Sequence, residues 1–269
     1  MLTLQDPLMI VTDLDGSLLD HHTYSWQPAQ YWLDRLTGAD IPLVLCTSKT
    51  AAEILPLQRA LGIAGAPFIS ENGAIVSGGD LSDVPATRVQ EAKDYAAICQ
   101  TLSQFREDFG FKFTGFNDVT EKEVAEWTGL TPADAELAMQ REASESIIWR
   151  DTPENFARFQ QALHDEKLTL IQGGRFWTVT SEGNDKGSAL RWLLKNIPTR
   201  TGQPPITIGL GDGPNDAVML DGVDYAVIIK GYSKEPVTLS RKDNQNIYAT
   251  TLYGPEGWSE GLAHFVSQE

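Results

Sequence analysis

IVTDLDGSLLD, residues 10–20, places two carboxylates directly after an apolar run. The run Leu8–Val11 predicts a buried strand, and Gly16 predicts a turn at its end. Asp13 and Asp15 are two residues apart on extended chain, so their side chains share one face, roughly 6.5 Å apart along the backbone. Acids this close raise one another's pKa unless a cation compensates them. The stretch therefore predicts a ligand site at the end of the first strand.

In the first part of the chain, predicted strands alternate with predicted helices. Apolar runs at 41–46 and 66–70 alternate with helical patterns at 27–38 and 50–62, and Pro56 is expected to kink the second helix or confine it to one side. Apolar runs separated by helices are typical of an α/β fold with a Rossmann-like parallel sheet covered on both faces. The pattern resumes with a helix at 184–196 and a strand at 205–210.

The middle of the chain has a different order of helical and strand patterns, and this order predicts a separate α/β unit. It contains helical patterns, for example at 91–110 and 153–167, and strand patterns at 146–151 and 168–180. Thr152 is expected to cap a helix whose first residue is Pro153. We therefore predict a core domain formed by residues 1–83 and 183–269, with a cap domain of residues 84–182 inserted in it.

Polar clusters follow three of the predicted core strands. They are Asp13 and Asp15 after the first strand, Thr47 and Ser48 after the second, and Asp212, Asn215 and Asp216 after the strand at 205–210. Ligands of open parallel sheets bind beyond the carboxyl ends of the strands. Mg²⁺ prefers oxygen ligands such as these carboxylates, and Lys186 with a strand-end hydroxyl would hold phosphate oxygens. The set predicts a phosphoryl-transfer site in which an aspartate can be the nucleophile.

Four segments, in order, resemble the motifs of the haloacid dehalogenase-like (HAD) phosphatases, and the resemblance spans nearly the whole chain. They are Asp13-Leu14-Asp15-Gly16-Ser17, the strand-end Thr47, Lys186 before a helix, and Gly211-Asp212-Gly213-Pro214-Asn215-Asp216. The resemblance implies a Mg²⁺-dependent phosphomonoesterase with Asp13 as nucleophile and Asp15 as general acid, then base. It also implies that Thr47 and Lys186 hold the phosphoryl group. The implied Mg²⁺ ligands are Asp13, the Asp15 carbonyl and Asp212, supported by Asn215 and Asp216.

The segment ENGA at 71–74 and the late cap are similar to the Cof-type branch of that superfamily. Most members of the branch have Thr-Gly-Arg at the second motif, where this chain has Thr47-Ser48-Lys49-Thr50. This departure, with REASE at 141–145 and GGRF at 173–176, resembles the mannosyl-3-phosphoglycerate phosphatases. The resemblance implies hydrolysis of 2-O-mannosyl-3-phosphoglycerate to mannosylglycerate and phosphate. The expected substrate-binding residues are Ser48, Lys49, Arg141 and Arg175, the two arginines holding the glycerate carboxylate.

Other functions share single features with this sequence. A broader sugar-phosphate phosphatase of the same branch, acting on sucrose or hexose phosphates, stays open. A non-catalytic phospho-acceptor is a different class, but it has no need of a second aspartate such as Asp15 or of a large cap. GWSEG at 257–261 matches a serine-hydrolase elbow but lacks an acid and a histidine with long spacing after it. An EF-hand needs Gly at its sixth position, and Gly16 is fourth from Asp13.

Composition limits the partners. The 269 residues carry a formal net charge of -16 with a pI near 4.6, which opposes non-specific binding to nucleic acid or an anionic membrane. Cys46 and Cys99 stand far apart and predict neither a disulfide framework nor a zinc site. The first residues have no secretory pattern and no apolar run approaches roughly 18 residues, so a cytoplasmic protein with a small phosphorylated substrate is expected. The sequence does not determine the oligomeric state.

Overall fold

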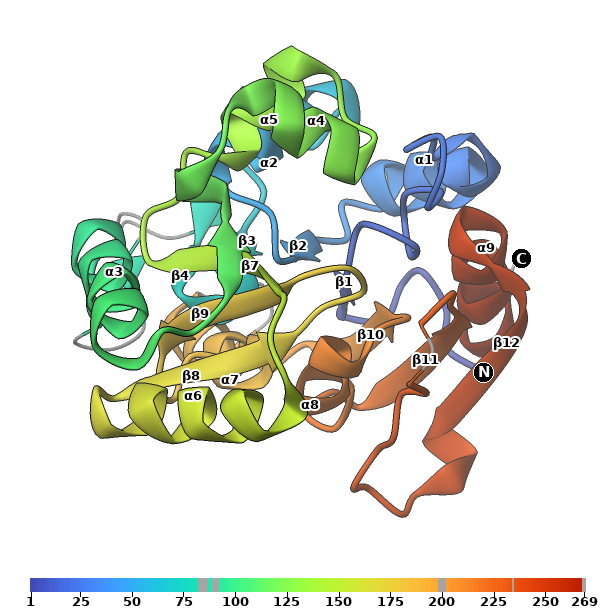
Figure 1. The fold of residues 1–269 in the computed structure, drawn as a ribbon. Coiled ribbons are helices and arrows are strands. Elements are labelled where there is room, and N and C mark those ends of the chain that lie inside the picture. The colour runs from blue at the N-terminus through green and yellow to red at the C-terminus, as the bar shows by residue number, and fades with distance from the viewer. Residues whose placement is uncertain (82–86, 89–91, 198–201, 234, 268–269) are drawn as a thin grey trace.

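The chain folds into a larger and a smaller β-sheet, each flanked by helices (Figure 1). The computed structural model describes residues 1–81, 87–88, 92–197, 202–233 and 235–267. Within these residues the larger sheet has eight strands in the order β12-β11-β10-β1-β2-β3-β4-β5. They are β1 (Leu8–Thr12), β2 (Leu43–Cys46), β3 (Phe68–Ser70), β4 (Ile75–Ser77), β5 (Thr87–Arg88), β10 (Ile206–Gly211), β11 (Tyr225–Lys230) and β12 (Ile247–Tyr253). Neighbours from β12 to β3 are parallel, which confirms the predicted α/β fold with a mostly parallel sheet.

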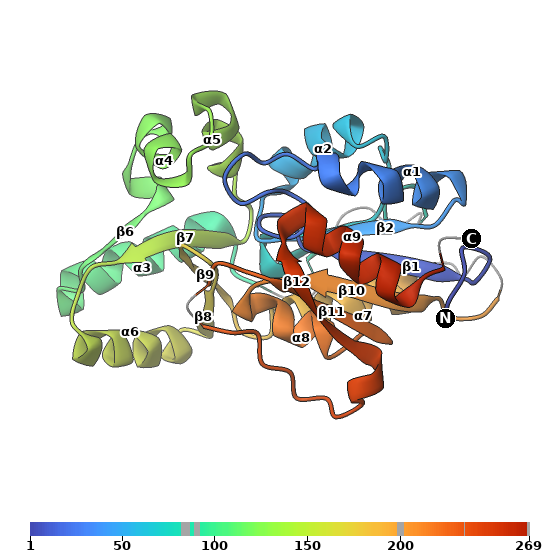
Figure 2. The same cartoon turned by 90° about the vertical axis from the view of Figure 1, so that its right-hand side faces the viewer.

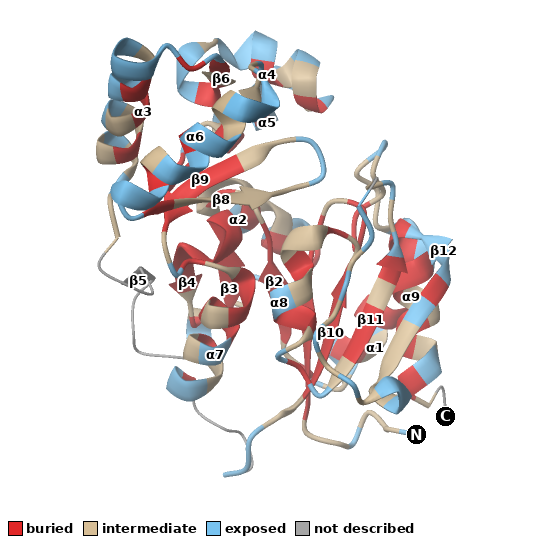
Figure 3. Ribbon diagram, turned by 60° about the horizontal axis from the view of Figure 1, so that its bottom comes forward, coloured by how far each residue is buried: buried red, intermediate tan, exposed pale blue. Residues whose placement is uncertain are grey.

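Helices cover both faces of this sheet (Figure 2). Leu8 and Ile10 of β1 belong to the core beneath α1 (Gln30–Gly38), α2 (Ala51–Ala60) and α9 (Gly254–Phe265). Met9 and Val11 belong to the core on the other face, with α7 (Lys186–Asn196) and α8 (Ala217–Leu220). Successive side chains of a strand point to opposite faces, so a strand buried on both sides is a continuous apolar run. Figure 3 shows the result as buried central strands.

Helix α2 continues through Pro56 from Ala51 to Ala60, so confinement of the helix to one side of Pro56 is wrong. A proline inside a helix removes one backbone hydrogen bond and crowds the preceding turn. Two features favour the helix in spite of this. Thr50 and Glu53 form a reciprocal capping box at its start, and Ile54 is fully buried in the core.

The smaller sheet is antiparallel, in the order β6-β7-β9-β8. Its strands are β6 (Phe113–Gly115), β7 (Ser144–Trp149), β8 (Leu168–Gln172) and β9 (Trp177–Ser181). The helices α3 (Tyr95–Phe109) and α6 (Pro153–Asp165) pack on it through a cluster rich in aromatic side chains. Thr152 caps α6 with Pro153 as its first residue, as predicted. Two further helices, α4 (Glu121–Thr128) and α5 (Pro132–Ala138), pack together around Phe116.

The division of the chain into core and cap stays a prediction. The expected boundary at 83/84 lies outside the described residues. Thr87–Arg88, which the sequence assigns to the cap, pairs with β4 at the edge of the larger sheet. None of the helices in the described part of the chain combines the length and apolarity that a membrane crossing needs.

Glu71 joins the two sheets through a buried carboxylate. It lies in a short 3₁₀ turn, Glu71–Gly73, after β3, and its side chain is fully buried. Its oxygens accept hydrogen bonds from the backbone N–H groups of Glu142 (2.8 Å) and Ala143 (3.1 Å) and from the Ser144 hydroxyl (2.7 Å). Hydrogen bonds to a charged acceptor are stronger than neutral ones. Glu71 therefore fixes the start of β7 against the end of β3.

The Glu71→Ala variant is expected to lose about 3 kcal/mol of folding stability, because three buried donors lose their acceptor. Urea unfolding of the purified protein measures this loss. Glu142→Ala, which removes a neighbouring exposed carboxylate, is the matched control and should change stability by less than about 0.5 kcal/mol. Equal stabilities for the two variants would contradict the role of Glu71.

Candidate active site

A cavity of about 210 Å³ lies where the ends of the core strands face the smaller sheet. Asp13 follows β1 and Asp212 follows β10, and both line the cavity. The smaller sheet and its loops contribute Arg141, Ser146 and Thr178. The placement agrees with the rule that ligands of open parallel sheets bind beyond the carboxyl ends of the strands.

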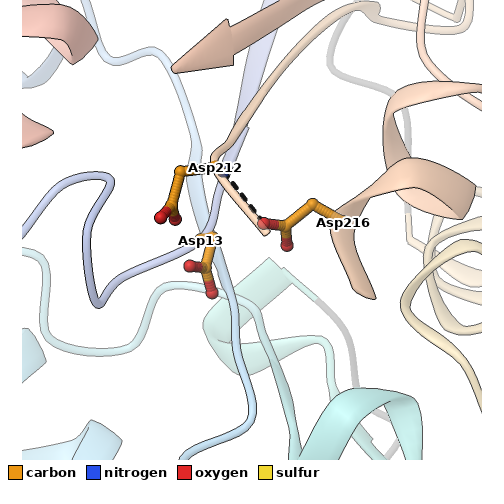
Figure 4. Close-up of side chains that lie close together, drawn as sticks. All are labelled: Asp13, Asp212 and Asp216. Carbon is orange, nitrogen blue, oxygen red and sulfur yellow. Dashed lines mark hydrogen bonds between the residues drawn. The ribbon is translucent and has the colours of Figure 1, made fainter. Parts of the chain in front are cut away.

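Asp13, Asp212 and Asp216 each offer a carboxylate oxygen within 4.8 Å of the others (Figure 4). Asp216 ends the 3₁₀ turn Pro214–Asp216 that follows β10. Gly16 makes room for Asp212, because a Cβ at this position would lie 2.5 Å from Asp212 Oδ2. Gly16 also has φ +85°, a left-handed conformation that favours glycine.

Lys186, the first residue of α7, lies between two of these acids. Its side chain is 0% exposed, and its Nζ is 2.7 Å from Asp13 Oδ1 and 2.6 Å from Asp216 Oδ1. The other oxygen of Asp216 accepts the backbone N–H groups of Asp212 (3.0 Å) and Gly213 (2.9 Å). Asp216 thus holds both the lysine and the loop that carries Asp212.

The cluster holds more negative charge than Lys186 compensates. Burial and the neighbouring Asp216 raise the pKa of Asp13 to about 7, although Lys186 opposes the shift. Burial and Asp13 raise the pKa of Asp212 well above its ordinary value. Burial would lower the pKa of Lys186, but Asp13 and Asp216 together raise it, so the lysine stays charged. Hard oxygen donors with excess negative charge fit a divalent cation such as Mg²⁺, and this cluster could hold one.

Asp15 is not part of this cluster and pairs with a different lysine. Its Oδ2 is 3.1 Å from Lys49 Nζ, which also lies 3.2 Å from Glu53 Oε1. The second oxygen, Asp15 Oδ1, is buried and has no hydrogen-bond partner among the described residues. Asp15 also lines the cavity.

Thr47 and Ser48 follow β2 as predicted, but they differ in position. Thr47 is buried, and its hydroxyl accepts the backbone N–H of Lys49 at 3.2 Å. Ser48 lines the cavity, and its carbonyl accepts a hydrogen bond from Arg141 at 3.2 Å.

Arg141 and Arg175 both line the cavity but have different surroundings. Arg141 is 8% exposed and donates to the Ser144 carbonyl (3.0 Å) and hydroxyl (2.8 Å). Arg175 is exposed, and its guanidinium donates to the carbonyl of Thr128 (2.6 Å) and that of His21 (3.4 Å). The hydrogen-bond acceptors that the described residues give Arg141 are neutral carbonyl and hydroxyl oxygens. Its charge also acts on the nearby Glu145 carboxylate, whose pKa burial raises and Arg141 lowers.

Sequence reasoning missed Asn72, which connects the site to the smaller sheet. The Asn72 Oδ1 accepts from Asn215 Nδ2 (2.9 Å), and the Asn72 amide donates to Thr178 Oγ1 (3.0 Å). Asn72 has φ +57°, a conformation that asparagine adopts more readily than most residues. The Asn-Gly pair at 72–73 signals such a turn, but no sequence rule names the side-chain partners.

Comparison with known proteins identifies the family and agrees with the fold. Residues 10–237 match the family model described as haloacid dehalogenase-like hydrolase, and the chain belongs to this family. The fold is similar to that of the HAD subclass IIB sugar phosphatase BT4131, with 17% identity over 96% of this chain and 98% of that chain and a TM-score of 0.66. It is also similar to BT1666 from Bacteroides thetaiotaomicron (17% identity, 97% and 96% covered, TM-score 0.67) and to a haloacid dehalogenase-like hydrolase from B. subtilis (20%, 96% and 98%, 0.63).

The Asp212→Asn variant is expected to stabilise the metal-free protein at alkaline pH. Folding raises the pKa of Asp212 above its ordinary 3.8, so the folded state binds this proton more tightly than the unfolded chain. Folding stability therefore falls as the pH rises above about 4, and the variant escapes this loss. In the presence of a chelator it should melt about 2–4 °C above the wild type at about pH 8, with a smaller difference at about pH 5.

Added Mg²⁺ should reverse this order, because a cation stabilises the wild-type cluster and binds the variant more weakly. Thermal unfolding with and without Mg²⁺ measures both effects. A metal-free variant that melts below the wild type at both pH values would show that the three acids do not repel one another as described.

Proposed function

We propose that the protein is a Mg²⁺-dependent phosphomonoesterase that hydrolyses 2-O-mannosyl-3-phosphoglycerate to mannosylglycerate and phosphate. The observation that carries this proposal is the position of Asp13. It stands at the floor of the cavity, with one oxygen held by Lys186 and with Asp212 beside it. A fixed, partly compensated carboxylate in a site for a phosphoryl group is suited to nucleophilic attack on phosphorus.

The first half of the proposed reaction transfers the phosphoryl group to Asp13. The Asp13 carboxylate forms a bond to phosphorus as the bond from phosphorus to the leaving oxygen breaks, and Asp15 gives its proton to that oxygen. In the second half, Asp15 takes a proton from water, the water oxygen bonds to phosphorus as the bond from phosphorus to the Asp13 oxygen breaks, and phosphate leaves. Asp13 is then regenerated.

The other core residues hold charge in place during these steps. Lys186 lies next to Asp13 and is charged, so it offsets the negative charge that builds on the phosphoryl oxygens. Mg²⁺ held by Asp13, the Asp15 carbonyl and Asp212, with Asn215 and Asp216 in support, would neutralise the remaining charge. Thr47 and Ser48 are proposed to position the phosphoryl group through their hydroxyl groups.

The cap side of the cavity supports a substrate with a second anionic group. Arg141 is a buried guanidinium whose hydrogen-bond partners are neutral oxygens, and a carboxylate suits a guanidinium in two-point contact. Arg175 is the second proposed contact, although its guanidinium already donates to Thr128 and His21. A phosphorylated glycerate with a sugar attached carries both the phosphate and the carboxylate.

A broader sugar-phosphate phosphatase is the second candidate. The engagement of Arg175 with backbone carbonyls favours it, because only Arg141 then remains to recognise a carboxylate. The solved structure of BT4131, described as a sugar phosphatase, has a similar fold. The cap and Asp15 argue against the phospho-acceptor alternative, which needs neither.

Phosphate release with Mg²⁺ should be at least about tenfold more efficient, in kcat/KM, for mannosyl-3-phosphoglycerate than for competing phosphates, about 1.4 kcal/mol of differential transition-state binding. The panel contains 3-phosphoglycerate, sucrose 6-phosphate, mannose 6-phosphate and glucose 6-phosphate. Asp13→Asn is the blank and should release no phosphate. Equal efficiencies across the panel would support the broader phosphatase, and no release from any substrate would contradict both candidates.

Replacement of Arg141 tests the carboxylate contact. Arg141→Met is expected to lower kcat/KM for mannosyl-3-phosphoglycerate roughly 30-fold, because a charged hydrogen bond of about 2 kcal/mol is lost. The methyl ester of the same substrate, which lacks the negative charge, should lose less than about threefold. Arg175→Met is the matched variant on the other side of the cavity, and thermal unfolding of both variants controls for folding. Equal losses for acid and ester would exclude Arg141 as the carboxylate contact.

A further inference from the structure

Lys49 is a largely buried lysine beside the N-terminus of helix α2, where a positive charge is unfavourable. It directly precedes Thr50, the N-cap residue of α2, and the N-terminus of a helix carries partial positive charge. Its side chain is only 11% exposed. Two carboxylates compensate it, Asp15 at 3.1 Å and Glu53 at 3.2 Å, and the ring of Tyr24 lies 5.4 Å from its Nζ.

Glu53 is itself fixed in position. Its Oε2 accepts the backbone N–H of Thr50 at 2.9 Å and its hydroxyl at 3.3 Å, while its Oε1 faces Lys49. The N-terminus of α2 thus fixes the Glu53 carboxylate by hydrogen bonds, Glu53 forms an ion pair with Lys49, and Lys49 forms a second ion pair with Asp15. Because α2 is packed into the core through Ile54, this chain of contacts starts from a rigid element.

The two oxygens of Asp15 are consequently unlike each other. Oδ2 is tied to Lys49, whereas Oδ1 is buried and without a partner among the described residues, on a side chain that lines the cavity. A buried polar atom without a partner is costly and calls for an explanation. A substrate atom that arrives in the cavity would supply the missing partner.

We propose that Lys49, held by Glu53, is a positioning residue that fixes Asp15 by Oδ2 and presents Oδ1 to the leaving oxygen of the substrate. This inference rests on the proposed phosphatase function. In the step concerned, the Asp13–phosphorus bond forms, the bond from phosphorus to the leaving oxygen breaks, and the proton passes from Asp15 Oδ1 to that oxygen. Lys49 touches none of the reacting atoms.

The leaving group provides the test, because a sugar or glycerate alkoxide needs a proton and a dinitrophenolate does not. Lys49→Met is expected to slow release of the leaving group in the first turnover roughly 10–100-fold for mannosyl-3-phosphoglycerate, and by less than about threefold for 2,4-dinitrophenyl phosphate. The comparison uses the first turnover because Asp15 also activates water in the second half of the reaction, which is the same for both substrates. Asp15→Asn should show the same selectivity. Lys49→Arg, which retains a cation for Asp15, should recover most of the loss, and Arg59→Met on the exposed side of α2 should show none.

Equal losses on both substrates would overturn the proposal, as would a Lys49→Met variant as active as the wild type on the alkyl phosphate. If Lys49→Met does not fold, as judged by thermal unfolding, Glu53→Gln carries the same comparison with the same expected selectivity. Failure of the phosphatase function is distinguishable: the wild type would then release phosphate from neither substrate, or Asp13→Asn would remain active on both.

Discussion

The buried charge of Lys186 is the constraint on which the rest of the site depends. An ammonium group without water is stable only when carboxylates compensate it, and breaking one such pair leaves an uncompensated charge. Its partners are Asp13, which follows β1, and Asp216, in the turn after β10, and they lie 173 and 30 residues away in the sequence. The two parts of the sequence that form the larger sheet therefore meet at one ammonium group, and the fold cannot form without bringing the acids together.

Because Lys186 binds two of the acids, the three carboxylates differ in how many of their oxygens are already engaged. Asp216 uses both oxygens for structure, one for Lys186 and one for the backbone of Asp212 and Gly213. Asp13 gives one oxygen to Lys186, and Asp212 gives one to the hydroxyl of Ser17 at 2.9 Å. Asp13 and Asp212 thus line the cavity while Asp216 is wholly enclosed. Burial, together with the neighbouring carboxylates, raises the pKa values of Asp13 and Asp212, a cost that a bound cation would offset.

Sequence reasoning predicted the fold and placed Asp13, Asp212 and Asp216 in one region, because periodicity identifies strands and parallel strands place their carboxyl ends at one edge. It predicted the partners of long side chains less well. The ion pairs of Lys49 with Asp15 and Glu53 were not predicted, nor were the hydrogen bonds of Arg175 to the carbonyls of Thr128 and His21. Both side chains line the cavity, and their contact with substrate stays a prediction.

The reason is physical. A lysine or arginine can reach several acceptors, and the choice among them depends on tertiary distances that no local pattern encodes. Asn72 was missed for the same reason, since its two partners lie 143 and 106 residues away. The continuation of α2 through Pro56 shows the complementary case, in which the cap and the core packing of a helix outweigh a local preference.

The hydrogen bonds between the parts of the chain that carry the two sheets differ in how far water can reach them. At the Glu71 end a charged acceptor is sealed from water by the backbone it binds. At the other end, the Tyr24 hydroxyl donates to the carbonyl of Thr128 and the exposed Arg175 donates to the carbonyl of His21, where water can reach. Water competes for the second set of bonds and not for the first. The free energy that each contact contributes therefore depends on where it stands, and the Glu71 contacts, shielded from solvent, contribute more per hydrogen bond than the exposed ones.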